Sequence, residues 1–199
     1  ALIDKFCQII SAKMDFLDQQ LQIDPTAPDL HCTPAMVSGL TGNGLKATWC
    51  RSMAQTLGVI SPAMFEEFEL DYLHSVANRF AYTYYGCCEP LHDRIDKLQQ
   101  YPNLRKIGVS PWADLEQSAE MIGGKYVFSR KPNPANVADA TDPEVIRKEI
   151  TDTVKICQKY GCPLDITLKD ISTVGYKPEN LMIWAKTASE VLDEYYGAE

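Results

Sequence analysis

From residue 61 onward the chain alternates strand-like and helix-like segments, and this alternation restricts the fold more than any other feature. Runs rich in aromatic and β-branched residues predict strands at 80–86, 104–110, 125–130 and 162–170. Apolar residues at helical spacing predict helices at 61–79, 90–101, 112–124, 142–161 and 177–197. Strands that are joined through helices of this length pair in parallel by right-handed crossovers. The sequence therefore predicts an α/β fold with four strand–helix units.

Residues at the expected helix ends support this division. Ser61 precedes Pro62, which combines a favourable cap with proline at the first helical position. Pro143 opens another predicted helix and Gly161 closes it. These signals place helix boundaries independently of the apolar spacing.

The first 60 residues are less regular. Residues 1–20 form an amphipathic helix pattern whose apolar face contains Leu2, Phe6, Ile9, Ile10 and Leu17. Residues 21–49 are rich in Pro, Gly and Thr and predict mainly a loop, with room for one short strand. Loops of this length in a compact domain are usually functional. We therefore divide the chain into 1–60, an N-terminal helix with a loop-rich lead-in segment, and 61–199, four units of a single domain.

Charge and composition restrict the partners. The formal net charge is −8 and Lys and Arg are scattered, which argues against nucleic acid because phosphate binding needs a basic face. No apolar run approaches the roughly 18 residues of a membrane-spanning helix, so no membrane partner is expected. The seven cysteines are odd in number and include no Cys-x-x-Cys pair. This usage predicts thiols in a reducing cytoplasm.

Two architectures contain such repeated units. A complete (β/α)8 barrel takes about 250 residues, so four units correspond to about half of one. The alternative is an open doubly wound sheet. No glycine-rich phosphate-binding turn follows a predicted strand, which gives a nucleotide-binding sheet little support.

Four short motifs follow one another in a specific order. They are Ser-Pro-x-x-Phe-x-x-Phe from residue 61, Trp112 with Asp114, Asn133 with Pro134, and Glu179 with Asn180. In this order and spacing they resemble the C-terminal half of the uroporphyrinogen decarboxylase superfamily, over about residues 55–196. Related members are the corrinoid-dependent and coenzyme-M methyltransferases.

The resemblance implies a fold and an incomplete barrel. The superfamily has a (β/α)8 TIM barrel, so this chain would be the C-terminal half of such a barrel. A half-barrel leaves two sheet edges and part of its core uncovered. We therefore expect an oligomer with a second copy, or pairing with a missing N-terminal half.

Functional residues of such barrels lie on the loops that follow the strands. The loop 86–92 contains Glu89, which we expect to act as a catalytic acid. A carboxylate that merely favours a helix N-terminus is an equal alternative. Cys87 and His92 in the same loop are candidate zinc ligands, and a packed turn is the alternative.

The zinc site of the methyltransferase relatives is not retained here. In those relatives a His-x-Cys pair on this strand and a later cysteine hold the metal. The matching strand end reads Thr83-Tyr84-Tyr85, and Lys169-Asp170 stands at the later position. The resemblance therefore does not itself supply zinc ligands.

The loops after the next two strands supply candidate substrate-binding residues. Trp112 is either a stacking wall for a ligand or a packing residue at the barrel rim. Arg130 and Lys131 suit a carboxylate or phosphate, or are solvated surface charges. Asn133 follows them in the same loop and is also expected to bind substrate.

The last strand and the long early loop complete the candidate site. Lys169 and Asp170 stand where, by the resemblance, decarboxylases place a substrate-contacting histidine. Lys169 is predicted to bind substrate and Asp170 to act in catalysis, although the two could simply pair or cap a turn. His31 joins the catalytic set if the early loop folds over the same face.

The resemblance implies a methyltransferase that moves a methyl group from a methoxylated or methylated small molecule to a corrinoid protein. No tightly bound cofactor is expected, because the corrinoid would be carried by that partner. A decarboxylase acting on a tetrapyrrole or another carboxylated substrate is one alternative, and a non-catalytic fragment that only associates is another.

Overall fold

The computed structural model describes residues 2–20, 29–30, 32–34, 37, 44–53, 55–101, 103–138, 141–169 and 171–197. Its centre is a sheet of five parallel strands in the order β3-β4-β5-β6-β7. They are β3 (Trp49–Ser52), β4 (Tyr82–Tyr85), β5 (Leu104–Val109), β6 (Val127–Arg130) and β7 (Leu164–Ile166). Each strand pairs with the next one along the chain, so the sheet grows in a single direction.

The predicted α/β class is confirmed, and all four predicted strands lie in the sheet. The fifth strand, β3, was not among them. Its four residues are too few to show a period-two pattern, and they become a strand by pairing with β4, from Trp49 opposite Tyr82 to Ser52 opposite Tyr85. Five sequential parallel strands with intervening helices fit part of a barrel, and the described residues do not close into a complete one.

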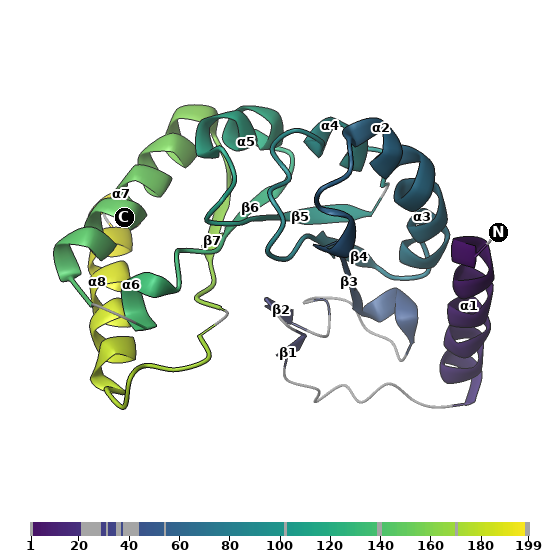
Figure 1. Cartoon of the computed structure of the whole chain (residues 1–199), viewed down its shortest axis with the longest axis horizontal. Helices are drawn as coiled ribbons and strands as arrows, with labels where there is room; N and C mark the ends of the chain where they lie inside the picture. The colour runs from purple at the N-terminus through teal and green to yellow at the C-terminus, as the bar shows by residue number, and fades with distance from the viewer. Residues whose placement is uncertain are drawn as a thin grey trace.

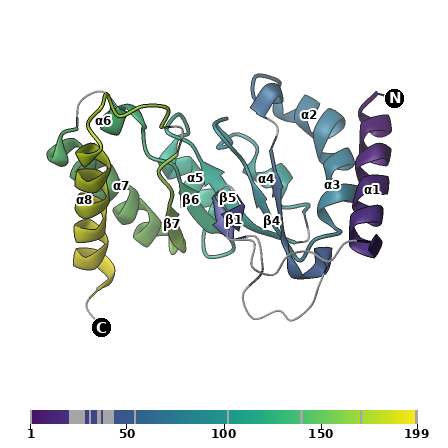
Figure 2. The same ribbon diagram turned by 90° about the horizontal axis from the view of Figure 1, so that it is seen from below.

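The helices, except the short α6 beside α8, lie along the outer side of the curved sheet, with α1 and α8 at opposite ends (Figures 1 and 2). They are α1 (Leu2–Gln20), α2 (Pro62–Phe65), the π-helical η3 (Glu66–Leu70), α3 (Asp71–Ala77), α4 (Ile95–Leu98), α5 (Leu115–Ile122), α6 (Ala135–Ala138), α7 (Pro143–Tyr160) and α8 (Glu179–Tyr196). The early segment adds the antiparallel pair β1 (Asp29–Leu30) and β2 (Thr33–Pro34) and the 3-10 turns η1 (Leu45–Ala47) and η2 (Gln55–Leu57). Within the described part of the chain, no helix has the length and apolar character needed to cross a bilayer.

Side chains alternate between the two faces of the sheet. On the outer face, Tyr85, Ile107 and Phe128 belong to one apolar core that also includes residues of α2, α4 and α5. A second core joins α7 to α8. On the inner face, Trp49 and Tyr84 form a smaller aromatic cluster. The large apolar core thus holds the helices to the sheet, while the inner face is left with aromatic and charged groups.

The helical segment after Ser61 begins as predicted but does not stay regular. The Ser61 hydroxyl accepts a hydrogen bond from the Met64 N–H at 3.3 Å. The π-helical stretch Glu66–Leu70 then shifts the residues that follow around the helix axis. As a result Glu69 is buried, whereas Phe68, which the apolar stripe of the sequence would bury, is exposed.

The N-terminal helix α1 confirms the predicted helix at residues 2–20. It packs against α3 and buries Cys7. Its stripe of apolar residues is not covered by the described chain, since Leu2, Phe6 and Ile9 are 71%, 56% and 58% exposed. Most of the apolar face of this amphipathic helix is therefore exposed in the described part of the structure.

Candidate functional site at the strand ends

The carboxyl ends of four strands bring three cationic side chains to one place. Arg51 lies on β3, Lys131 follows β6 and Lys169 follows β7, and all three interact with the Gly86–Cys87 turn after β4. Lys131 and Lys169 are buried, and Arg51 is half-buried. Parallel strands place their carboxyl ends at the same edge, which explains how residues up to 118 positions apart in sequence can meet.

Lys131 is the most deeply buried of these cations, with only 1% of its surface exposed. Its Nζ donates to the carbonyl of Cys87 at 2.8 Å and lies 5.1 Å from the centre of the Tyr84 ring. Its partners are thus dipoles and an aromatic face. Burial lowers the pKa of Lys131 to about 8, and the nearby Lys169 and Arg51 charges act in the same direction. An anionic ligand beside this ammonium would offset that cost.

Gly108 on β5 makes room for this lysine. A Cβ at this position would lie 2.6 Å from the Lys131 Nζ and 2.9 Å from the Tyr84 hydroxyl oxygen, closer than real contacts allow. Because Gly108 has no side chain, the inner face at this point has room for the Lys131 ammonium group. Arg51 contributes a further polar atom, because its buried Nε has no hydrogen-bond partner among the described residues.

Cys87 brings a thiol to the group. Its Sγ lies 3.1 Å from the Lys169 Nζ. Burial raises the pKa of the Cys87 thiol, but hydrogen bonds from Lys169 and Arg51 outweigh burial and leave the pKa below its usual value. Burial raises the pKa of Cys50 and of Cys157 to about 12 each, although the Arg130 charge partly opposes burial at Cys157. The strand-end cations therefore favour ionisation of the Cys87 thiol.

Glu89 lies in the same turn as predicted and is buried, with 5% of its surface exposed. Its Oε2 accepts a hydrogen bond from the Cys87 N–H at 3.0 Å. A Cβ added at Gly58 would lie 3.0 Å from the Cβ of Glu89, so the loop after β3 covers the Glu89 side chain. The carboxylate thus stands beside the cation cluster and fixes the backbone of the turn.

Arg130 and Asn133 have partners outside this cluster. Arg130 is adjacent to Lys131 but points to the opposite face, where it pairs with Glu149 at 3.1 Å and donates to the Ser110 carbonyl at 2.8 Å. The Asn133 N–H donates to the same Glu149 carboxylate at 2.9 Å. These contacts hold the loop after β6 to α7. Substrate binding by either residue stays a prediction.

Trp112 and His92 lie at the rim. Trp112 is 66% exposed on the loop between β5 and α5, which suits contact with a ligand or partner more than packing at the barrel rim. The His92 Nδ1 accepts a hydrogen bond from the Asp114 N–H at 3.2 Å, so this ring is directed to the start of α5 while Cys87 contacts Lys169. Among the described residues no group of three His, Cys, Asp or Glu side chains is arranged to hold a metal ion.

His31 and Asp170, both expected in the catalytic set, lie outside the described residues. Cys32, next to His31, does pack against the inner-face cluster of Trp49 and Tyr84. Cys32 thus reaches the inner face, and the place of His31 in the catalytic set stays a prediction.

Sequence reasoning missed Arg51, Tyr84 and Gly108. Arg51 belongs to the strand that was not predicted. Tyr84 and Gly108 each lie two residues from the end of a predicted strand, and this position was a signal for a site. The sequence does not specify which face of the strand is the inner one, so it could not distinguish them from Tyr85 and Val109.

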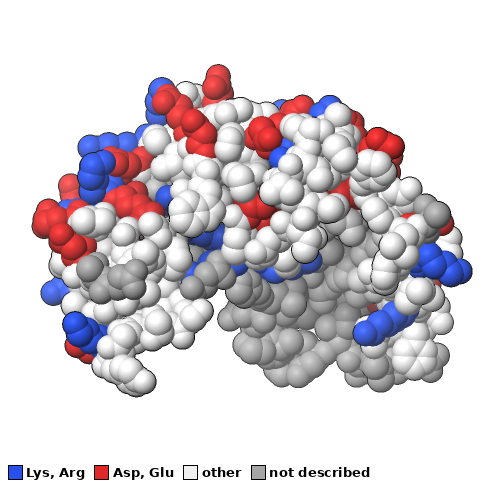
Figure 3. Space-filling view, viewed as in Figure 1, with Lys and Arg blue, Asp and Glu red and all other residues white. Residues whose placement is uncertain are grey.

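The surface charge agrees with an anion site on the concave side. Lys and Arg atoms appear where this side is hollowed, and over the outer helices Asp and Glu atoms are mixed with Lys and Arg atoms (Figure 3). An acidic chain with net charge −8 thus presents cations on the side to which the strand ends contribute.

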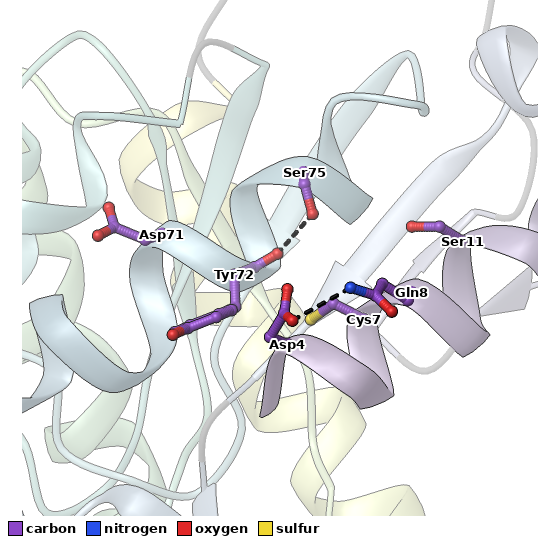
Figure 4. Close-up of a pocket in the computed structure, with 7 residues that line it drawn as sticks. All are labelled: Asp4, Cys7, Gln8, Ser11, Asp71, Tyr72 and Ser75. Carbon is purple, nitrogen blue, oxygen red and sulfur yellow. Dashed lines mark hydrogen bonds between the residues drawn. The ribbon is translucent and has the colours of Figure 1, made fainter. Parts of the chain in front are cut away.

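A separate cleft of about 500 Å³ lies between α1 and α3 (Figure 4). Asp4 and Asp71 contribute carboxylates to its wall, and the Gln8 side chain donates to Asp4 at 3.1 Å. This cleft lies on the helix side of the sheet and shares no residue with the strand-end cluster.

Comparison with known proteins does not identify the chain. No protein-family model matches it, and no curated protein matches it.

Proposed function

We propose that this chain belongs to an enzyme of the uroporphyrinogen decarboxylase-like type whose small-molecule substrate binds at the strand ends through an anionic group. The observation that carries this proposal is the convergence of Lys131, Lys169 and Arg51 from three strands on the turn at Cys87. Cationic donors of this kind bind carboxylates or phosphates by charge-assisted hydrogen bonds. Lys131 would gain most from such a ligand, because its ammonium is buried against a backbone carbonyl and an aromatic ring and a buried charge is costly.

The reaction that we propose first is transfer of a methyl group from a methoxylated or methylated substrate to a corrinoid carried by a separate protein. The corrinoid would supply the cobalt centre that accepts the methyl group. Lys131 and Lys169 would hold a carboxylate of the methyl donor, and Glu89 would protonate the oxygen or nitrogen that leaves. Trp112, exposed at the rim, would contact the substrate ring or the carrier protein.

A second candidate is decarboxylation of a substrate with several carboxylates. The same two buried lysines favour it, since each can hold one carboxylate while another leaves as carbon dioxide. Neither candidate requires zinc.

Binding of a simple carboxylate tests the shared part of both candidates. Titration calorimetry with methoxybenzoate would compare the wild type with Lys131→Met and with Lys148→Met, an exposed lysine on α7. Loss of one charged hydrogen bond costs about 2 kcal/mol, so Lys131→Met should weaken binding roughly 30-fold while Lys148→Met leaves it unchanged. Equal binding by all three proteins would contradict the proposal.

Turnover separates the two reactions. A panel of methoxylated aromatic acids with a cobalamin carrier protein should yield methylcobalamin if methyl transfer is right. Release of carbon dioxide from carboxylated pyrroles or tetrapyrroles, with no methylcobalamin, would favour the second candidate. Turnover of neither class, in the presence of the partner that completes the barrel, would favour the non-catalytic alternative.

The partners and compartment that we propose follow from the same features. Strands β3 and β7 end the sheet as described, and a second copy or a further barrel segment would cover these edges. None of the seven cysteines, all of which are described, forms a disulfide, which supports a reducing compartment such as the cytoplasm.

A further inference from the structure

Two adjacent thiols share one ammonium group at the end of β4. The Sγ atoms of Cys87 and Cys88 lie 3.6 Å apart. The Lys169 Nζ lies 3.1 Å from the Cys87 sulfur and 3.4 Å from the Cys88 sulfur. The charge of Lys169 thus favours the thiolate form of either residue.

The two sulfurs differ in access. Cys87 is buried, with 6% of its surface exposed. Its Sγ contacts Lys169, and its N–H donates to the Glu89 carboxylate. Cys88 is half-buried and lies nearer to solvent. A reagent therefore reaches Cys88 first, and the Cys87 sulfur lies 3.6 Å from the Cys88 sulfur. This is the arrangement of an attacking thiol and a resolving thiol.

We propose that Cys87 and Cys88 form a thiol-modification site that reacts with low-molecular-weight disulfides and closes to a disulfide between adjacent residues. This proposal does not depend on the reaction assigned to the chain. It rests on the positions of the two sulfurs, their shared contact with Lys169, and their unequal exposure.

The exchange proceeds in two balanced steps. First, the Cys88 thiolate attacks one sulfur of the small disulfide, whose S–S bond breaks and whose other sulfur leaves as a thiolate and takes up a proton. Second, the Cys87 thiolate attacks the Cys88 sulfur of this mixed disulfide and releases the remaining small thiol. The two protein thiols lose two electrons and two protons, and one small disulfide becomes two small thiols.

The geometry predicts that the closed form is easily reversed. Adjacent Cα atoms are about 3.8 Å apart, less than the roughly 4.4–6.8 Å that most disulfides span. The sulfurs must also approach to about 2.05 Å. Strained disulfides of this kind are the ones that small thiols reduce readily. The site therefore suits reversible modification rather than permanent stabilisation.

Mass spectrometry can test the proposal directly. The reduced full chain would be incubated with oxidised glutathione, alkylated with iodoacetamide and digested with trypsin. Cleavage after Arg79 and Arg94 gives the peptide 80–94, whose only cysteines are Cys87 and Cys88. We expect this peptide to carry no alkyl group and to be lighter by two hydrogens, and we expect dithiothreitol to restore full alkylation.

Three variants identify the roles. Cys87→Ser should stop at a glutathione adduct on Cys88, because the resolving thiol is gone. Cys88→Ser should react several-fold more slowly than the wild type, since only the buried thiol remains. Lys169→Met should also slow the exchange several-fold, and its circular dichroism would show that it is folded.

Other results would overturn the proposal. One is full alkylation of both cysteines after exposure to oxidised glutathione. Another is adduct formation at Cys157, whose pKa is raised, at the same rate as at Cys88. A third is an unchanged rate in folded Lys169→Met, which would remove the role of the shared ammonium.

Discussion

At the scale of single residues, Gly108 decides whether Lys131 can occupy its position. Replacing Gly108 with Ala puts a methyl group 2.6 Å from the Lys131 Nζ. We expect Gly108→Ala to lower the free energy of unfolding by about 1–3 kcal/mol, as overpacking does, and to weaken binding of a carboxylate. Urea denaturation and titration calorimetry would measure the two effects. Gly124→Ala is the matched control, because its added Cβ meets nothing closer than 3.6 Å.

Glu69 makes the stability of the chain depend on pH. Burial raises the pKa of this carboxyl to about 7, although the hydrogen bond from the Tyr85 hydroxyl and the Arg94 charge partly oppose burial. Between the unfolded pKa near 4.5 and the folded value, the folded chain binds more protons than the unfolded chain. The contribution of Glu69 to the free energy of unfolding is therefore fully present at low pH. It falls as the pH rises from about 4.5 to 7, by about 3 kcal/mol in total.

The variant Glu69→Gln keeps a group that can accept from Tyr85 but does not titrate. Urea denaturation at a series of pH values should show a flatter pH dependence for Glu69→Gln than for the wild type, and a more stable variant above pH 7. Parallel curves for the two proteins would show that Glu69 titrates normally.

At the scale of the elements, local capping signals predicted particular helix ends, whereas the helix expected at 90–101 is reduced to α4 (Ile95–Leu98). Ser61, Pro143 and Gly161 act within one turn of their own backbone, so the sequence alone places these helix ends correctly. Strand β3 forms only because Trp49 to Ser52 pair with β4, some 33 residues later. The sequence also could not show that the side chains of Arg130 and Lys131 point to opposite faces, because this depends on which face of β6 the helices cover.

The start of α7 offers a test of such a local signal. The Asp142 carboxylate accepts a hydrogen bond from the Glu144 N–H at 2.9 Å, and Pro143 fills the first helical position. Asp142→Ala should lower the free energy of unfolding by about 1 kcal/mol, whereas Asp142→Asn, which can also cap, should change it little. Urea denaturation monitored by circular dichroism would distinguish them. Equal losses in both variants would point to the charge rather than the hydrogen bond.

At the scale of the whole molecule, the described part of the chain leaves an apolar surface on α1 uncovered. Leu2, Phe6 and Ile9 form an exposed stripe on α1, at the β3 end of the sheet (Figure 1). Large exposed apolar patches on soluble domains usually mark interaction surfaces. Together with the sheet edge at β3, this stripe predicts that the purified chain associates with itself when no other partner is present.

Sedimentation velocity over a wide range of protein concentration would measure that association. The double variant Phe6→Glu, Ile9→Glu should shift the equilibrium strongly towards the monomer, because burial of the stripe would then require burial of two carboxylates. The double variant Val145→Glu, Met182→Glu makes the same charge change at exposed apolar positions on α7 and α8 and should associate as the wild type does. A wild-type chain that stays monomeric at every concentration would contradict the prediction. Association that survives in the α1 variant would assign it instead to the edges at β3 and β7, where backbone hydrogen bonding rather than apolar burial would hold the copies together.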